Sequence, residues 1–253
     1  MKNCPKCQSK MIKKPRHKIL CGDATKKEDV ERLMNGQKAD MVYTDPPYGM
    51  NLDTDFSDMK PESSFALEKS VKWGRKYKNV EGDSVDFNPA HIFELFSDCD
   101  EIFLWGADYY AERLDNKNYG SWIVWDKREN ADGSNLDGMY GSCFELCWSK
   151  TKHRREIARI KWAMIFGIEK EFDKKRHHPT QKPIDLACWF FERWGKDKIN
   201  IVDLYLGSGS TLIACEKTNR RCFGMEIEPH YVSVIIKRWE TFTGKKAHKE
   251  SES

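Results

Sequence analysis

The chain has 253 residues, of which 33% are charged and 39% hydrophobic, and its formal net charge is +3. This length suits one large α/β domain, or one domain with a small insert. No apolar run approaches the roughly 20 residues of a membrane helix, and residues 1–20 lack the apolar core of a signal peptide. We therefore expect a cytoplasmic protein with no membrane partner.

Positive charge gathers in two segments of the chain. Residues 1–20 carry seven Lys or Arg and no acidic residue, and residues 151–180 carry nine Lys or Arg against four acidic residues. The remainder is therefore net negative. Local basic patches on a nearly neutral body fit a polyanionic partner, although two solvated surface segments would give the same charge pattern.

The first half of the chain alternates between predicted strands and helices. The earliest helix is expected over 25–36, with Thr25 as N-cap, Glu28 completing a capping box and Gly36 ending it. Residues 50–88 are polar and mixed in charge, and we interpret them as a mobile loop insert. The pattern predicts strands over 17–23, 39–45, 101–107, 121–127 and 143–150, with further helices over 88–98 and 108–116.

The second half begins with a basic, irregular stretch over 151–176 and then returns to alternation. The pattern there predicts strands over 198–206 and 220–228, and helices over 183–196, 211–219 and 229–244. Strands alternating with helices favour a largely parallel sheet with helices on both faces. We therefore expect an α/β fold in a single domain over residues 1–253.

A glycine-rich turn follows the strand over 198–206. The sequence GSGS at 207–210 allows a ligand to approach the backbone closely. Glu226 ends the next strand, at the place where a dinucleotide-type βαβ unit carries its ribose-binding carboxylate. No Walker lysine follows, so the turn favours a nucleoside ligand without a demanding phosphate. A turn that merely joins a strand to a helix is the alternative interpretation.

Two other stretches carry polar groups suited to a ligand. Within HHPTQKP, Thr180, Gln181 and Lys182 precede a helix and suit a carboxylate, although a basic helix cap would look the same. In TDPPYG the prolines end a strand. Asp45 and the Pro46 carbonyl can accept the two hydrogens of an exocyclic amine, and Tyr48 can stack on the base.

The order DPPY, HPTQKP, DLYLGSGST and GMEIEP resembles the beta-class amino-methyltransferases of DNA, the DPPY type specific for adenine N6 or cytosine N4. The resemblance covers roughly residues 17–244. It implies a Rossmann-like methyltransferase fold, S-adenosylmethionine as cofactor and double-stranded DNA as substrate, in a bacterial or phage-infected cell. Because the target amine is paired inside a duplex, it also implies base flipping.

The resemblance assigns roles to particular residues. Asp45, Pro46, Pro47 and Tyr48 would form the catalytic turn, with Asp45 also near the cofactor. Glu226 would bind the ribose, and Thr180, Gln181 and Lys182 the methionine carboxylate. The methionine part would lie against Asp203, Gly207, Ser208 and Gly209, and the adenine near Asp23 and Ala24. Leu204 and Tyr205 depart from the family's usual Pro and Phe, which puts the loop geometry in doubt more than cofactor binding.

DNA contacts are expected in residues 151–176, where the family has its target-recognition segment. Arg154, Arg155, Arg159 and Lys161 are candidates for phosphate contacts, and arginine can also bind guanine edges. The segment is short, so we expect a short recognition sequence. A homodimer and a restriction endonuclease partner stay open.

Adenine N6 is the leading target, because related cytosine-N4 enzymes more often carry Ser where this chain has Asp45. Cytosine-N4 methylation is the alternative within the family. The alternatives of other classes are an enzyme that methylates RNA or a protein amide, and an inactive DNA-binding protein.

A zinc set can be drawn from Cys4, Cys7, His17 and Cys21, but Cys21 adjoins the predicted cofactor turn and a second CxxC is absent. We therefore expect no metal.

Overall fold

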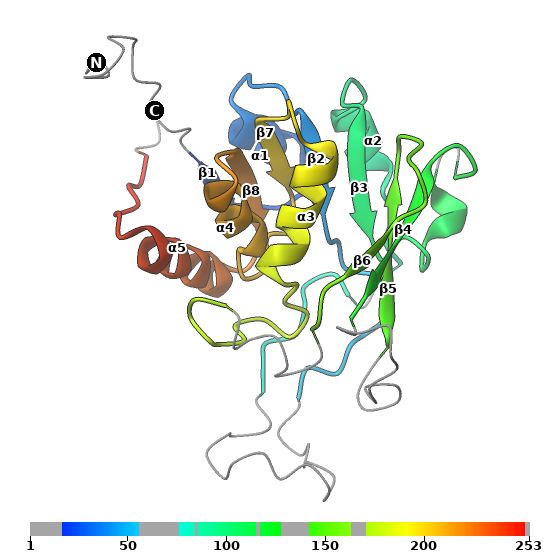
Figure 1. Cartoon of the computed structure of the whole chain (residues 1–253). Helices are drawn as coiled ribbons and strands as arrows, with labels where there is room; N and C mark the ends of the chain where they lie inside the picture. The colour runs from blue at the N-terminus through cyan, green and yellow to red at the C-terminus, as the bar shows by residue number, and fades with distance from the viewer. Residues whose placement is uncertain are drawn as a thin grey trace, which may run out of the picture.

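The computed structural model describes residues 17–55, 76–83, 86–114, 117–127, 142–162 and 171–250. These residues form an eight-stranded sheet in the order β1-β8-β7-β2-β3-β5-β4-β6 (Figure 1). Only β5 runs antiparallel to its neighbours, so the mostly parallel sheet predicted from the sequence is confirmed. The strands are β1 Lys18–Cys21, β2 Met41–Thr44, β3 Glu101–Trp105, β4 Ser121–Asp126, β5 Phe144–Ser149, β6 Ile157–Arg159, β7 Asn200–Asp203 and β8 Arg221–Glu226.

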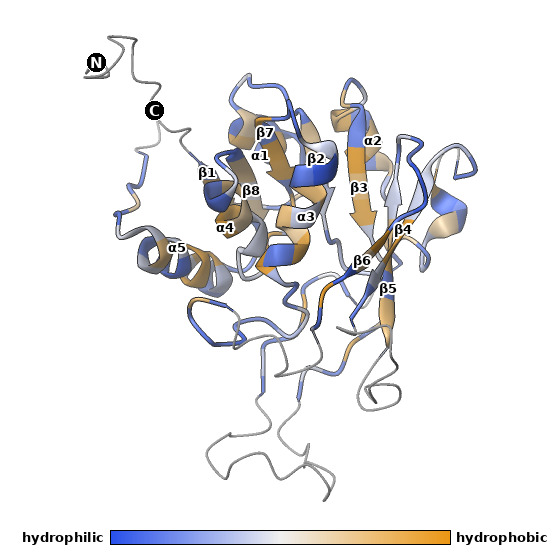
Figure 2. Cartoon of the chain, in the orientation of Figure 1, coloured by the Kyte–Doolittle hydropathy of each residue, from blue (hydrophilic) through white to orange (hydrophobic). Residues whose placement is uncertain are grey.

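Helices cover both faces of the sheet because the central strands are apolar on both sides. On β2, Met41 and Tyr43 join one core, while Val42 between them joins the other. The first core is closed by α3 (Ile184–Trp194), α4 (Ser210–Lys217) and α5 (Pro229–Thr243), and the second by α1 (Lys27–Met34) and α2 (Ala90–Leu95). Figure 2 shows the hydrophobic colour concentrated on the strands and on the inward sides of the helices.

The predicted capping of the first helix is wrong in detail. Helix α1 begins at Lys27, with Lys26 at the N-cap and no side-chain cap. The Thr25 hydroxyl instead donates to Asp23 Oδ1 at 2.7 Å, because a local turn at Asp23 takes both the hydroxyl and the backbone N–H of Thr25. The helix ends at Met34, and its C-cap is Asn35, which adopts the left-handed conformation one residue before the predicted stop at Gly36.

Two other expectations are corrected by tertiary contacts. The helix expected over 108–116 is reduced to a single 3₁₀ turn at Ala111–Arg113, since the Tyr110 hydroxyl donates to the Trp105 carbonyl and Arg113 reaches back to Phe87. The stretch 151–176 was expected to be irregular, yet it contributes strand β6, which pairs with β4. Part of this stretch, residues 163–170, lies outside the described residues, as do residues 56–75 and 84–85 of the predicted loop insert.

The parallel strands place their carboxyl ends at one edge of the sheet, which is where ligands bind in open α/β folds. Asp45 follows β2, Gly106 follows β3, and Asp203 and Glu226 end β7 and β8.

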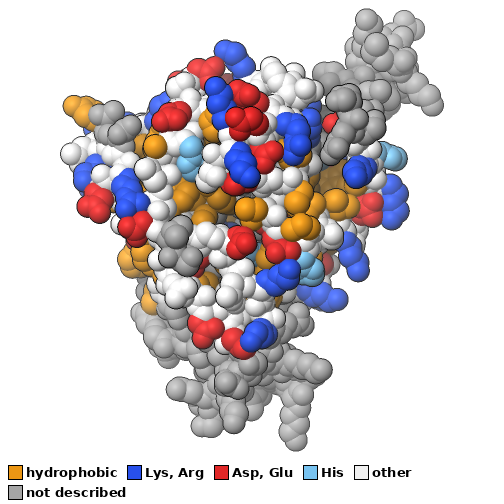
Figure 3. Space-filling model, turned by 180° about the vertical axis from the view of Figure 1, so that it is seen from behind, with side chains coloured by type: hydrophobic (Ala, Val, Ile, Leu, Met, Phe, Trp, Pro, Cys, Tyr) orange, Lys and Arg blue, Asp and Glu red, His pale blue; other side chains and the backbone are white. Residues whose placement is uncertain are grey.

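Within the described ranges, no helix has the length and apolar character needed to cross a membrane. The face seen from behind carries Lys and Arg interspersed with Asp and Glu, with a band of hydrophobic side chains across its middle (Figure 3).

Candidate active site

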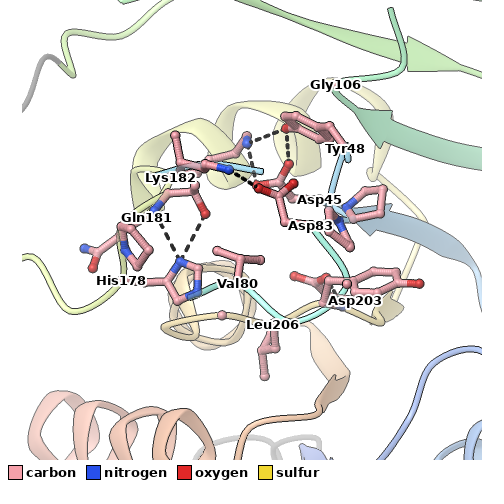
Figure 4. A pocket seen from close by; sticks show the side chains of 18 of the residues that line it. Asp45, Tyr48, Val80, Asp83, Gly106, His178, Gln181, Lys182, Asp203 and Leu206 are labelled. Carbon is pink, nitrogen blue, oxygen red and sulfur yellow. Dashed lines mark hydrogen bonds and ion pairs between the residues drawn. The ribbon is translucent and has the colours of Figure 1, made fainter. Parts of the chain in front are cut away.

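A cavity of about 1040 Å³ lies at the carboxyl edge of the sheet, and the three sequence motifs meet in it (Figure 4). Gly209 does not line it, because that residue is the N-cap of α4 behind the turn. The predicted site residues that do line it are Asp23, Ala24, Asp45, Pro46, Pro47, Tyr48, Thr180, Gln181, Lys182, Asp203, Gly207, Ser208 and Glu226. Segments that lie far apart in the chain therefore share one concave site.

The carboxylate of Asp45 is held from both sides. The Tyr48 hydroxyl donates to Oδ1 and the Lys182 ammonium to Oδ2. Lys182 also lies 3.2 Å from the Tyr48 hydroxyl, and its side chain is only 11% exposed. Burial raises the pKa of Asp45, and the positive charge of Lys182 opposes that rise. The lysine that the sequence predicts to bind the cofactor carboxylate thus contacts the carboxylate of Asp45.

A second carboxylate, Glu145 on β5, completes this cluster. Its Oε2 lies 3.2 Å from Lys182 Nζ and its Oε1 lies 2.6 Å from Lys127 Nζ. Burial alone would raise the pKa of Glu145, but the two lysines outweigh it and lower the pKa to about 2. Charges of alternating sign therefore run from Lys127 through Glu145 and Lys182 to Asp45.

The backbone after the catalytic turn is fixed by one buried side chain, Asp83. Its Oδ1 accepts from the N–H groups of Gly49 and Met50 at 3.1 and 3.2 Å, and its Oδ2 accepts from Leu52 at 2.8 Å. Three backbone donors on one carboxylate replace the ladder bonds that this segment lacks. These hydrogen bonds connect the cavity wall formed by residues 49–52 to the segment over residues 76–83.

The ring of Tyr48 needs a glycine beside it. Gly106 has φ of +62°, and a Cβ there would stand 2.1 Å from the Tyr48 ring. That ring also stacks on Tyr109, with centroids 5.3 Å apart and planes 8° apart. Tyr109 is 56% exposed and lines the cavity mouth. An aromatic surface is thus presented to anything that enters beside Asp45.

The glycine turn after β7 is held by the end of β8. The Gly207 N–H donates to Glu226 Oε2 at 2.8 Å, and the Glu228 N–H donates to Glu226 Oε1 at 3.0 Å. Gly207 has φ of +53°, a conformation that favours glycine. A carboxylate has about four lone-pair sites, so Glu226 retains acceptor capacity toward the cavity.

Asp203 joins the two turns at their base. Its Oδ1 accepts from the Thr44 hydroxyl at 2.8 Å, just before the catalytic turn, and from the Tyr205 N–H at 3.1 Å in the glycine turn. Burial raises the pKa of Asp203 to about 6, although hydrogen bonds from Thr211 and Thr44 oppose the rise. The residue acts here as a link between β7 and β2.

The remaining residues of the HPTQKP stretch are engaged locally. Thr180 is exposed at the cavity and lies 3.0 Å through its hydroxyl from His178 Nδ1. Gln181 is buried, and its side-chain oxygen accepts from the His177 N–H at 2.8 Å. Burial lowers the pKa of His178 to about 3, with Arg176 and Lys182 acting in the same direction. His178 is therefore a neutral wall of the cavity beside Gly207.

A buried arginine on α5 clamps the glycine turn to the segment before α3. Arg238 donates to the Ser208 carbonyl, to Glu171 Oε2 and to Asp173 Oδ2, each at 2.8 Å. Glu171 in turn accepts from the Ile184 N–H at the start of α3. One guanidinium thus holds together the two cavity walls that the sequence had assigned to the cofactor.

The four basic residues predicted to contact DNA separate into two pairs. Next to Arg154 and Arg155, His153 bonds to Ser121 and Glu101, the first residues of β4 and β3. That edge of the sheet is opposite the cavity, roughly 17 Å away along β4 at 3.3 Å per residue. The other pair, Arg159 and Lys161, stands beside cavity-lining residues, because Arg159 pairs with the last residue of β4, and the Trp162 N–H donates to the Lys127 carbonyl.

The candidate zinc set is not assembled by the described residues. Both ring nitrogens of His17 are used, one 2.7 Å from Glu216 Oε2 and the other accepting from the Cys222 N–H. Cys4 and Cys7 lie outside the described residues. Within the described ranges, no group of three or more His, Cys, Asp or Glu is placed to hold a metal ion.

Several site residues have no counterpart in the sequence interpretation: Lys127, Glu145, Asp83, Gly106, Tyr109 and Arg238. For Glu145 a signal existed, since it is a charged residue inside the apolar strand CFELCWS. For Gly106 the signal was a glycine directly after EIFLW. Asp83 and Arg238 gave none, because their partners lie far away in the chain.

Comparison with known proteins finds similarity to DNA methyltransferases. A DNA methylase family model, N6_N4_Mtase, matches residues 143–238. The type II methyltransferase M2.DpnII of Streptococcus pneumoniae is 23% identical over 235 residues, covering 82% of this chain and 84% of its own. The type II methyltransferase M1.MboII of Moraxella bovis is 22% identical over 242 residues, covering 79% and 88%.

A solved structure has the same fold. The crystal structure of the M1.HpyAVI–SAM complex superposes with a TM-score of 0.51 at 21% identity, over 87% of this chain and 98% of that one. The chain therefore has a Rossmann-like fold of the kind found in an enzyme solved in complex with S-adenosylmethionine. The family match and the type II methyltransferase relatives support a DNA amino-methyltransferase of the N6/N4 class, a family that depends on S-adenosylmethionine.

Proposed function

We propose that this enzyme methylates the N6 amine of adenine in double-stranded DNA. The observation that carries the proposal is the position of Asp45, a carboxylate at the carboxyl end of β2 that shares one cavity with the glycine turn and Glu226. The choice of adenine rests on Asp45 itself, because related cytosine-N4 enzymes more often carry Ser at that place.

The residues around the glycine turn fit the cofactor. Glu226 keeps lone pairs for ribose hydroxyls after accepting two backbone N–H groups. Gly207 and Ser208 would line the methionine part, and Asp23 and Ala24 the adenine part, on the other side of Glu226. Lys182 is engaged by Asp45, so among the predicted carboxylate ligands only the Thr180 hydroxyl faces the cavity from an exposed side chain.

Asp45 and the Pro46 carbonyl would activate the target amine. When bound, the cofactor supplies a methyl group from its sulfonium sulfur, and the sulfur is left as a neutral thioether. The amine of adenine is a poor nucleophile because its lone pair is delocalised into the ring. Two acceptors on its two hydrogens favour a pyramidal nitrogen with its lone pair free, and the nitrogen then loses one proton to Asp45 or to solvent.

The target base would leave the helix to reach Asp45. The exposed ring of Tyr109, which stacks on Tyr48, offers it a stacking surface at the cavity mouth, and stacking on an aromatic ring contributes about 1–3 kcal/mol per base. Unstacking the base costs a few kcal/mol, so this surface offsets a substantial part of that cost.

Phosphate contacts are proposed for Arg159 and Lys161 in the target-recognition segment over 151–176. These residues stand at the cavity edge, while Arg154 and Arg155 stand at the opposite edge. Reversing the charge of Arg159 should weaken DNA binding and flatten its salt dependence, whereas the matched reversal at Arg154 should do so much less. Equal effects would place DNA across both edges.

The activity itself is tested with purified protein, duplex DNA, RNA and cofactor carrying a labelled methyl group, followed by digestion and mass spectrometry of the nucleosides. We expect N6-methyladenine from DNA. N4-methylcytosine would keep the enzyme class and overturn the choice of base, and label only in RNA, or in neither nucleic acid, would overturn the proposal. Homodimerisation, a restriction endonuclease partner, a single domain over residues 1–253 and a cytoplasmic location remain predictions.

A further inference from the structure

Lys182 and Glu145 form a pair whose place the activity described so far does not explain. Lys182 lies just before α3 and Glu145 on β5, yet both side chains turn into the cavity toward Asp45. Figure 4 shows the Lys182 amine directed at Asp45 and Tyr48, across the cavity from Leu206. Buried charges in such positions are costly unless each has a partner.

The geometry points to a positioning role: we propose that Lys182 fixes and charges the catalytic carboxylate of Asp45, and that Glu145 holds Lys182 in that place. This inference deepens the proposed function and rests on it for the role of Asp45. It replaces the assignment of Lys182 to the methionine carboxylate of the cofactor.

Contacts on the lysine support this role. Its ammonium has three hydrogens, and three oxygens lie within reach: Asp45 Oδ2, Glu145 Oε2 at 3.2 Å and the Tyr48 hydroxyl at 3.2 Å. The ammonium also lies 5.2 Å from the centre of the Trp105 ring, within the range of a cation–π contact. The contacts with Asp45 and Tyr48 are hydrogen bonds and the contact with Glu145 is an ion pair, so the side chain is held toward β2 and β5.

Charge balance explains why Glu145 is needed. Lys182 alone would neutralise Asp45 and place a positive charge beside an amine that becomes positive as it is methylated. Glu145 restores one negative charge to the group of three, and Lys127 compensates Glu145 on its far side at 2.6 Å. The cavity thus holds a fixed acceptor without a net positive field at the target nitrogen.

Opposite effects on the titration of Asp45 follow from these charges. Removing the positive charge of Lys182 should raise the pKa of Asp45, and removing the negative charge of Glu145 should lower it. Tyr48 faces Asp45 from its own turn. The other titratable groups that interact with Asp45 are Tyr43 on β2, Tyr110 after β3, Cys147 on β5 and Asp203 on β7.

The test follows the Asp45 carboxyl by carbon-13 NMR in cofactor-free protein labelled at aspartate carboxyls, with Asp45→Asn to assign its signal. Lys182→Met should move the midpoint to higher pH and Glu145→Gln to lower pH, by a measurable fraction of a pH unit or more. Lys182→Arg should leave it nearly in place. Lys217→Met is the matched control, since Lys217 pairs with Asp185 on the surface.

Kinetics and cofactor binding complete the design. The acid limb of the kcat profile should follow the same two directions, with kcat of Lys182→Met about 100-fold lower and its Kd for S-adenosylmethionine within about threefold of the parent protein. An unmoved Asp45 midpoint in Glu145→Gln and Lys182→Met overturns the proposal. So does a large loss of cofactor affinity in Lys182→Met without a change in the midpoint.

Two further outcomes have separate meanings. If Lys182→Met does not fold, Glu145→Gln decides alone: a downward shift supports the proposal, and no shift overturns it. If the parent protein methylates no nucleic acid, the proposed function fails, while the NMR titration still reports whether Lys182 and Glu145 set the state of Asp45.

Discussion

The catalytic turn after β2 and the glycine turn after β7 stand at neighbouring strand ends, but they are held in place differently. Asp45 depends on Lys182, 137 positions away, while Gly207 depends on Glu226, only 19 positions away in the same βαβ unit. The catalytic turn is therefore a product of the whole fold, and the glycine turn is largely a local structure. Variants of the two turns should fail in different ways.

The largest separation is expected for Asp45→Ala. Methyl transfer should fall at least about 10³-fold, because an acceptor for the reacting amine is lost, while the Kd for S-adenosylmethionine changes by less than about threefold. Steady-state kinetics on duplex DNA and calorimetric titration of the cofactor measure the two quantities. The exposed Asp53→Ala is a matched control, and near-normal turnover in Asp45→Ala would remove Asp45 from the reaction.

Removing the clamp of the glycine turn should act on stability. Arg238→Met leaves Glu171 and Asp173 without their guanidinium in a site where the Arg238 side chain is 2% exposed. Breaking a buried pair by removing one partner costs about 3–5 kcal/mol of unfolding free energy. Urea denaturation checks this, with the exposed Arg193→Met as control. A loss of unfolding free energy below about 1 kcal/mol would mean that the glycine turn does not depend on Arg238.

The link between the two turns should respond to pH. The folded pKa of Asp203 is raised by burial to about 6, so its stabilising protonation is complete below about pH 4 and is lost as pH rises through 6. Asp203→Asn lacks this dependence. Its unfolding free energy relative to the parent should therefore rise by up to about 3 kcal/mol between pH 4 and 7. A constant difference across that range would contradict the buried position of the carboxyl.

The smallest effect should come from Glu226→Gln. The proposed role of Glu226 is to accept from the ribose hydroxyls. Replacing this charged acceptor weakens a hydrogen bond worth about 1.5–3 kcal/mol, so the Kd for S-adenosylmethionine should rise about 10–100-fold. With saturating cofactor, kcat should stay within a few-fold. Glu240→Gln on the surface of α5 is the control. A fall in kcat without a change in Kd would contradict the assignment of Glu226 to cofactor binding alone.

The sequence could predict what depends on neighbours in the chain. The alternation of strands and helices and the glycine turn follow from local patterns, as does the presence of a proline turn after β2, and each is present in the structure. It could not predict that Lys182 turns to Asp45, because HPTQKP shows which groups are present but not where the fold sends them. Arg154 and Arg159 look equivalent in sequence, yet the segment leading into strand β6 places Arg154 near the start of β4 and Arg159 beside its end.

The clamp made by Arg238 shows the same limit. A helix over residues 229–244 is predictable, but its arginine serves Ser208, Glu171 and Asp173 only because α5 packs beside α4. Likewise the 3₁₀ turn at Ala111–Arg113 replaces a predicted helix because Tyr110 and Arg113 are used by distant backbone. Tertiary contacts outweigh local propensity at these places.

The most direct test is a crystal structure of the enzyme with S-adenosylhomocysteine and a duplex containing its recognition sequence. The account predicts an adenine outside the helix, with its N6 within hydrogen-bonding distance of Asp45 and the Pro46 carbonyl, and the ribose of the nucleoside against Glu226. A base that remains stacked in the duplex, or an exocyclic amine held away from Asp45 with Lys182 turned to the cofactor carboxylate, would contradict it.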